Sequence, residues 1–208
     1  MSINAGEFDK IAREIFAPAY PAIAEQIKDH TRITKGYCLD IGCGGGYLGL
    51  ALARITQLNV YLLDQLQDMI DIANKNIARE ELEHRVEGIV GDVHQIPLPD
   101  NSMNLVISRG SLFFWEDQVK AFREIYRVLA PGGMTFIGGG FGSEQILRQI
   151  EKKMLQKDPQ WSEKRQQRIG KQSIADYQDK LKQAGISTYD IAHSEAGMWI
   201  IMHKNTEV

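Results

Sequence analysis

The sequence is poor in cysteine, histidine and long apolar runs, and each shortage excludes a class of protein. Cys38 and Cys43 are the only cysteines among 208 residues, which excludes a disulfide framework and fits a reducing compartment. The five histidines include no pair at the close spacing of metal ligands, so no metal site is expected. No apolar run approaches the roughly 18 residues that a membrane-spanning helix needs.

An excess of positive charge is also lacking. The 24 Lys and Arg residues and 27 Asp and Glu residues give a formal net charge of -3, whereas dedicated nucleic-acid-binding domains are usually basic. The first residues, MSINAGEFDKIARE, lack the charged-then-apolar pattern of a secretory signal. We therefore expect a cytoplasmic protein without a nucleic-acid partner or a membrane span. The oligomeric state stays open.

From residue 37 onwards, apolar runs alternate with amphipathic helical patterns. Strands are predicted at residues 37–41, 60–63, 86–90, 104–108, 134–138, 188–192 and 198–203. Helices are predicted at residues 47–55, 68–79, 117–129, 144–156 and 173–184. This alternation predicts a parallel sheet with helices on both faces and right-handed crossovers. The last two strands, joined by a short HSEAG turn, are expected to form an antiparallel hairpin at the sheet edge.

Local signals mark several helix ends. Asp117 is a candidate N-cap, and the PGG sequence at residues 131–133 ends the helix that Asp117 begins. Ser173 with Asp176 resembles a capping box at the start of the last helix, and Gly185 ends that helix.

Two segments lie outside the alternation. Apolar residues from Phe8 to Phe16 recur at helical spacing, Pro18 and Pro21 break this helix, and Pro21 opens a second one. After the fifth strand, some thirty residues form a stretch too long for an ordinary connection. Its basic residues are Arg148, Lys152, Lys153, Lys157, Lys164, Arg165, Arg168 and Lys171. Two interpretations are open: a solvated helical hairpin, or a cap over a substrate site that favours anionic ligands.

The stretch LDIGCGGGYLG, residues 39–49, is a glycine-rich turn between a strand and a helix. Such turns let ligand groups approach the backbone and its N–H groups closely. Gly44, Gly46 and Gly49 match the GxGxxG fingerprint of dinucleotide-binding folds, and Asp64, 20 residues after Gly44, would hold a ribose. This interpretation favours NAD.

A second interpretation starts from Asp40, which precedes the alternating Gly42, Gly44 and Gly46. Its carboxylate would repel a pyrophosphate and attract an ammonium group. S-adenosylmethionine carries an ammonium group and a cationic sulfur but no phosphate. Asp92, which ends the third strand, could accept a hydrogen bond from an adenine amino group. We therefore favour S-adenosylmethionine, with S-adenosylhomocysteine as its product, over NAD.

Four motifs in this order resemble the class I S-adenosylmethionine-dependent methyltransferases, above all the small domains akin to ubiquinone and menaquinone C-methyltransferases. They read LDIGCGGG, VYLLDQLQDMIDIA, GDVHQIPLPDNSMNLVISRGSLFFWED and EIYRVLAPGGMTFI, within residues 37–138. The resemblance implies an α/β fold with a Rossmann-like, doubly wound seven-stranded sheet of order 3-2-1-4-5-7-6. The sheet would be mostly parallel, with an antiparallel C-terminal strand, N-terminal helices and a helical insertion after the fifth strand.

The resemblance also implies the site. Cofactor contacts are expected from Asp40, Gly42, Gly44, Gly46, Asp64, Gln65, Met69, Asp92, Val93, Ser108 and Arg109. Tyr20, Arg109 and Trp115 are candidates for positioning, and no catalytic residue is identified. Methyl transfer from a sulfonium is an in-line displacement that depends chiefly on alignment, so the absence of a catalytic triad is no objection.

The sequence departs from many relatives at two places. Met103-Asn104 stands where they have Phe-Asp, a difference that we expect to be structural. Phe113-Phe114-Trp115 stands where they often have histidines, which predicts an aromatic wall without an evident general base.

We expect a single domain over residues 1–208, with cap helices at 1–35, a cofactor-binding core at 36–140, a helical insertion at 141–172, and the last helix and edge strands at 173–208. The predicted function is methyl transfer to a small-molecule acceptor, possibly an anionic one. A non-catalytic S-adenosylmethionine-binding sensor or accessory protein is the alternative, and an NAD-dependent oxidoreductase is less favoured.

Overall fold

The computed structural model describes residues 5–206, except for the side chains of residues 171 and 172. Within this range the strands are β1 (Lys35–Ile41), β2 (Gln57–Asp64), β3 (Val86–Val90), β4 (Met103–Arg109), β5 (Leu129–Gly140), β6 (Tyr189–Ser194) and β7 (Gly197–Met202). The α-helices are α1 (Ala5–Ile11), α2 (Ala19–Thr31), α3 (Tyr47–Ile55), α4 (Gln67–Arg79), α5 (Gln118–Val128), α6 (Glu144–Leu155), α7 (Trp161–Ile169) and α8 (Lys171–Gln183). A π-helical turn, η1 (Ala12–Phe16), and a 3-10 turn, η2 (Leu112–Phe114), complete the helical elements.

The strands form one sheet in the order β3-β2-β1-β4-β5-β7-β6, which confirms the expected order. β1 to β5 are parallel, while β7 pairs antiparallel with both β5 and β6. From β1 the chain adds β2 and β3 on one side of β1, and it then returns to add β4 and β5 on the other side. The connections that follow β1 and β4 therefore leave the sheet in opposite directions. Open α/β sheets bind ligands at such a switch point, beyond the carboxyl ends of the strands.

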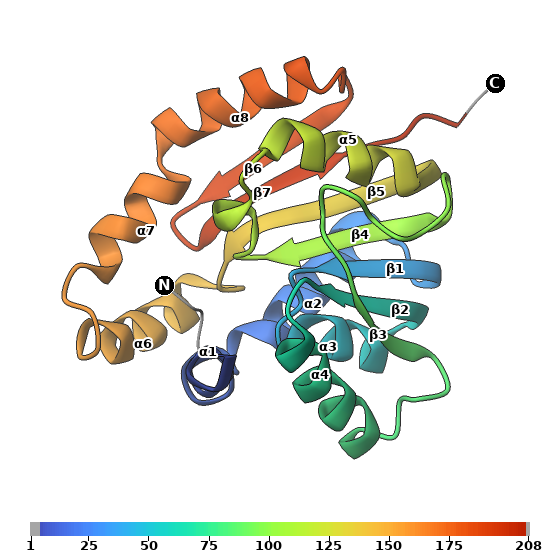
Figure 1. The fold of residues 1–208 in the computed structure, drawn as a ribbon. Helices are drawn as coiled ribbons and strands as arrows, with labels where there is room; N and C mark the ends of the chain where they lie inside the picture. Colours follow the sequence, from blue (N-terminus) through green and yellow to red (C-terminus); the bar gives the residue numbers. More distant parts are fainter. Residues whose placement is uncertain (1–4, 207–208) are drawn as a thin grey trace.

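Helices cover both faces of the sheet. Figure 1 shows α2, α3 and α4 on one side and α5 and α8 on the other. Side chains alternate along β1, so Cys38 enters the core under α2 and α3, whereas Leu39 and Ile41 enter the core under α5 and α8. Cys38 is fully buried and serves as a small apolar residue of the core. The Asn104 side chain accepts a hydrogen bond from the backbone N–H of Tyr37 at 2.9 Å, a structural role.

Of the predicted helix starts, the N-cap at Asp117 is confirmed and the capping box at Ser173 is not. The Asp117 carboxylate accepts a hydrogen bond from the Lys120 backbone N–H at 2.9 Å, which confirms the predicted N-cap of α5. The capping box at Ser173 is wrong, because Gly170 joins α7 directly to α8 and the helix already begins at residue 171. The Ser173 hydroxyl instead donates to the carbonyl of Gln167 at 2.7 Å.

The segments before β1 and after β5 meet at the carboxyl edge of the sheet. Pro18 is the N-cap of α2, which begins at Ala19 rather than at Pro21. In Figure 1, α6 and α7 extend beyond the sheet on the side toward which the β4 arrow points, and α1 lies near α6. The N-terminal helices and the long insertion therefore both border the switch point.

Arg127 of α5 ties the β3–β4 connection to the core. Its guanidinium bonds to the carboxylates of Glu124 and Asp100 and to the carbonyls of Ile96 and Leu98, at 2.6 to 3.0 Å. We expect Arg127→Met to lower the free energy of unfolding by about 1–2 kcal/mol in urea denaturation, because several part-buried acceptors lose one charged donor.

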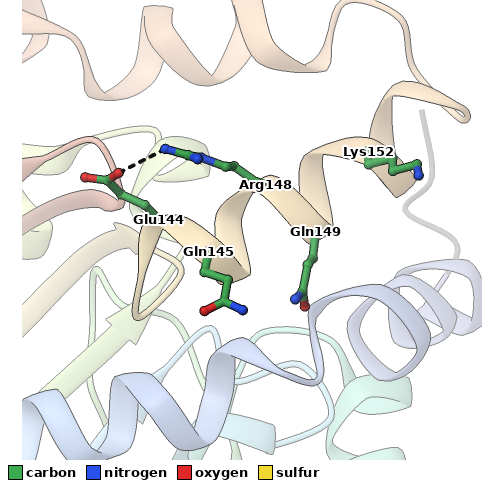
Figure 2. Close-up of a pocket in the computed structure, with 5 residues that line it drawn as sticks. All are labelled: Glu144, Gln145, Arg148, Gln149 and Lys152. Atoms are coloured by element: carbon green, nitrogen blue, oxygen red, sulfur yellow. Dashed lines mark hydrogen bonds and ion pairs between the residues drawn. The ribbon is translucent and has the colours of Figure 1, made fainter.

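Arg148→Met is the matched control. Arg148 makes a single 3.4 Å ion pair with Glu144 on the exposed surface of α6 (Figure 2). Its replacement should change the free energy of unfolding by less than about 0.5 kcal/mol. Equal losses in the two variants would contradict the role assigned to Arg127.

Candidate functional site

A cavity of about 1060 Å³ lies at the carboxyl edge of the sheet. Ligand pockets usually span roughly 300–1,000 Å³, so this one has room for more than one small molecule. The predicted residues that line it are Tyr20, Asp40, Gly42, Gly44, Asp64, Gln65, Met69, Asp92, Val93, Arg109 and Trp115. The structure thus brings together residues from five different parts of the chain.

Two predicted site residues do not line the cavity. Gly46 has a left-handed backbone (φ 78°), and a Cβ there would lie 2.6 Å from the Leu62 side chain, so this glycine permits close packing of α3 on β2. Ser108 is fully buried, with its hydroxyl 2.6 Å from that of Ser111. Ser111, which sequence reasoning missed, lines the cavity and donates to the Ile41 carbonyl at 3.0 Å.

Asp40, at the end of β1, is a buried carboxyl group at the base of the cavity. Its Oδ2 accepts a hydrogen bond from the Gly49 backbone N–H at 2.9 Å. Burial raises the pKa of Asp40 to about 7; the Gly49 bond opposes this shift, and the negative charge of Asp64 adds to it. Asp40 therefore changes charge near neutral pH.

Asp64, at the end of β2, holds the glycine turn in place. Its Oδ2 accepts from the Gly44 N–H at 3.0 Å and its Oδ1 from the Leu66 N–H at 3.1 Å. Burial raises the pKa of Asp64, although both backbone bonds oppose the shift. Gly44 has φ 53°, and a Cβ there would meet no atom within 4 Å, so the turn faces open space. The result is a bare cradle between two carboxyl groups.

Asp92, which follows β3, is part of a small hydrogen-bond network with His94 and Asp117 in the cavity wall. Its Oδ1 accepts from the His94 N–H at 2.9 Å and lies 2.7 Å from His94 Nδ1. The Asp117 backbone N–H donates to His94 Nε2 at 3.2 Å, so the ring proton sits on Nδ1 and points to Asp92. His94 also lines the cavity. The His94 N–H holds the pKa of Asp92 below its usual value.

Arg109, at the end of β4, is a half-buried cation surrounded by aromatic rings. Its guanidinium carbon lies 4.6 Å from the ring centre of Phe16, 5.5 Å from Tyr20 and 5.1 Å from Phe141. Its Nε donates to the Gly140 carbonyl at 2.9 Å. Burial lowers the pKa of Arg109 and raises that of Tyr20. Among residues 5–206, no carboxylate forms an ion pair with Arg109, and Tyr20 is the neighbour that acts on its charge.

Trp115, which directly follows η2, lines the same cavity. Its ring packs edge-on against Phe122 at 6.1 Å, and Phe113 and Phe114 line the cavity beside it. The predicted aromatic wall is therefore present.

The N-terminal helices close the cavity above the glycine turn. The Tyr47 hydroxyl donates to Asp9 Oδ1 at 2.7 Å, and the rings of Tyr20 and Tyr47 stack at 5.4 Å. Sequence reasoning missed the contact between Asp9 and Tyr47, since Asp9 belongs to no motif and 38 residues separate the two.

The basic insertion after β5 fits both interpretations in part: some of its basic residues line the cavity, and others lie on the solvated surface. Lys164, Arg165 and Arg168 of α7 line the large cavity. Arg148 and Lys152 of α6 line a separate open hollow of about 490 Å³ on the surface of that helix, shown in Figure 2. The Lys171 side chain lies outside the described residues. The α7 part thus borders the cavity, whereas this face of α6 is exposed.

Other kinds of site find no support in the described part of the chain. Residues 5–206 contain no cluster of three or more His, Cys, Asp or Glu side chains that could hold a metal ion. No helix within that range is long and apolar enough to cross a membrane.

Comparisons with known proteins point in one direction. The family described as "Methyltransferase domain" matches residues 39–137. A crystal structure from Methanococcus maripaludis, described as that of "a putative s-adenosyl-l-methionine-dependent methyltransferase", is 43% identical, covers 100% of this chain and 99% of its own, and superposes with a TM-score of 0.95.

Two curated relatives match part of the chain. The sterol 24-C-methyltransferase erg6 of Aspergillus fumigatus is 33% identical over 56% of this chain and 32% of its own length. The chloroplastic 2-methyl-6-phytyl-1,4-hydroquinone methyltransferase 1 of Oryza sativa subsp. japonica is 32% identical over 49% of this chain and 30% of its own length. The matched region thus spans about a third of the length of these curated relatives.

Proposed function

This chain belongs to the S-adenosylmethionine-dependent methyltransferases, and from that premise we propose that it transfers a methyl group from S-adenosylmethionine to a small, anionic acceptor. The observation that carries the proposal is the continuity of one cavity, which joins the acidic glycine turn to an aromatic and basic chamber under α7. The printed names of the sterol and hydroquinone relatives support a small-molecule acceptor.

The residues around the turn fit the cofactor. The open space at Gly44 admits a group close to the backbone. Asp40 would hold the ammonium group, directly or through water, and Asp64 would accept hydrogen bonds from the ribose hydroxyls. Asp92 and Val93 would contact the adenine edge. A pyrophosphate would face two carboxyl groups at 40 and 64, which disfavours NAD.

The remaining walls would position the two reactants. When bound, S-adenosylmethionine supplies an electrophilic methyl group on a cationic sulfur. Tyr20 and Arg109 would hold the carboxylate end of the cofactor. The rings of Phe16 and Phe141 would exclude water from the space beyond it. Holding an acceptor atom in line at near-attack distance is worth about 7–11 kcal/mol, so positioning is the main task of these residues.

Calorimetry with S-adenosylmethionine, S-adenosylhomocysteine and NAD tests cofactor choice. We expect both adenosyl compounds to bind at least about a hundredfold more tightly than NAD, a difference of about 2.7 kcal/mol. Tight NAD binding without binding of the adenosyl compounds would overturn the proposal.

A second measurement separates catalysis from binding. The protein is incubated with S-adenosylmethionine and a small-molecule fraction of a cell extract, and S-adenosylhomocysteine is quantified. We expect it to accumulate only when both are present. Cofactor binding without product across all fractions would favour the non-catalytic alternative.

A further inference from the structure

Arg165 of α7 places a positive charge in the wall of the large cavity. Its side chain is half-buried, and its Nε is the only fully covered side-chain nitrogen or oxygen without a hydrogen-bond partner among the described residues. One other nitrogen, Nη2, donates to the backbone carbonyl of Glu195 in the turn between β6 and β7. Because Nε itself is covered, a ligand would meet the positive charge that the guanidinium shares over its other nitrogens, and a cation in a cavity wall favours an anionic ligand.

No protein carboxylate takes the place of such a ligand. Within residues 5–206, no acid forms an ion pair with Arg165 within 4 Å. Glu151 and Glu195 act on Arg165 only as weaker influences on its pKa, which burial lowers. The Glu151 carboxylate is occupied by the Ser162 hydroxyl at 2.5 Å.

The neighbouring cations of α7 differ from Arg165 in their contacts and exposure. Lys164 pairs with Asp158 at 2.8 Å. Arg168 lies over the rings of Phe113 and Phe114, at 5.7 and 5.2 Å from their centres. Lys164 and Arg168 are exposed, whereas Arg165 is half-buried, so Arg165 is the α7 cation best placed to bind an anion inside the cavity. Its planar guanidinium can donate two parallel hydrogen bonds to a carboxylate.

The space beside Arg165 is apolar. Its guanidinium carbon lies 5.9 Å from the Phe141 ring centre, and the Phe141 ring contacts those of Trp161 at 5.8 Å and Phe16 at 6.1 Å. A ligand here would place an apolar body among the rings and a charged end at the arginine.

Arg109 and Arg165 have different surroundings, although both approach the Phe141 ring. Arg109 contacts Tyr20, a neighbour of Asp40 at the glycine turn, which is the end of the cavity suited to the cofactor. Arg165 is anchored to the β6–β7 turn at Glu195, away from the strand ends that carry the acids. Two anions, one on the cofactor and one on the acceptor, would satisfy both guanidinium groups.

We propose that Arg165 binds a carboxylate of the methyl acceptor, whose apolar body packs against Phe16, Phe141 and Trp161. This inference rests on the proposed function and narrows its acceptor to carboxylic acids with a small apolar body. Arg165 is then a specificity-determining residue that leaves cofactor binding unaffected.

Calorimetry on the protein saturated with S-adenosylhomocysteine tests the proposal. The probes are benzoate and hexanoate, their neutral amides benzamide and hexanamide, and phenyl phosphate. We expect at least one acid to bind about tenfold or more tightly than its amide, and phenyl phosphate to bind less tightly than benzoate. Arg165→Gln should abolish the preference for the acid, and Arg165→Lys should restore part of it.

Arg148→Gln on the surface of α6 is the control and should keep the full preference. S-adenosylhomocysteine affinity and melting temperature should change little in all three variants. Equal binding of acids and amides, a retained preference in Arg165→Gln, or stronger binding of phenyl phosphate would overturn this inference while leaving the proposed function intact. A protein that does not bind S-adenosylhomocysteine at all would instead overturn the proposed function.

Discussion

Asp64→Ala is expected to weaken S-adenosylmethionine binding by about a hundredfold or more. The substitution removes the proposed acceptor of two ribose hydroxyl groups, and hydrogen bonds to a charged group are worth about 1.5–3 kcal/mol each. It also frees the N–H groups of Gly44 and Leu66, which the carboxylate binds at 3.0 and 3.1 Å. Calorimetric titration with the cofactor measures the loss.

Two further variants separate binding from folding. Asp64→Asn keeps one acceptor for the turn but loses the charge, so it should retain most of the stability and still weaken the cofactor by about tenfold or more. Asp71→Ala removes an exposed acid of α4 whose partner is Gln67, and it should leave affinity unchanged. If Asp64→Asn bound S-adenosylmethionine as tightly as the wild type, Asp64 would not contact the cofactor.

Asp40→Asn is expected to stabilise the cofactor-free protein at pH 8 by roughly 2–4 kcal/mol while weakening the cofactor. The pKa of Asp40 is about 7 in the folded protein, against an ordinary value of 3.8 for an aspartate side chain. Between these values the native state binds more protons than the unfolded state, so the free energy of unfolding falls as pH rises from about 4 to 7. Each pKa unit is worth about 1.4 kcal/mol, and asparagine avoids this loss.

The same carboxyl group should make cofactor affinity depend on pH. Because an ammonium group prefers the ionised carboxylate, the wild-type affinity should rise about tenfold between pH 5.5 and 7, and in Asp40→Asn this rise should disappear. Urea denaturation at pH 5 and pH 8 measures the stability effect, and calorimetry across the pH range measures the affinity effect. A wild-type affinity that is flat over this range would contradict an ionised Asp40 in the complex.

The sheet and the glycine turn were predictable because their signals are local. Asp40 and Asp64 follow apolar strands directly, and parallel strands bring their carboxyl ends to one edge. Short-range polar contacts were less predictable. Ser108 and Ser111 are three residues apart in the sequence, yet only Ser111 lines the cavity. No periodic pattern in the sequence distinguishes the two. The start of α8 was misjudged at Ser173 because Gly170 joins two helices at a point that capping preferences did not mark.

The sequence by itself determined a doubly wound α/β fold and an acidic, glycine-lined edge suited to a cationic nucleoside, since strand periodicity and turn chemistry act over a few residues. Only the tertiary structure decided that Phe16, Phe141 and Arg165 share one chamber. These side chains come from three separate elements, and their meeting depends on how the N-terminal helices and α7 pack beyond the sheet. No local pattern encodes that packing, because it is selected by the shape of the whole core.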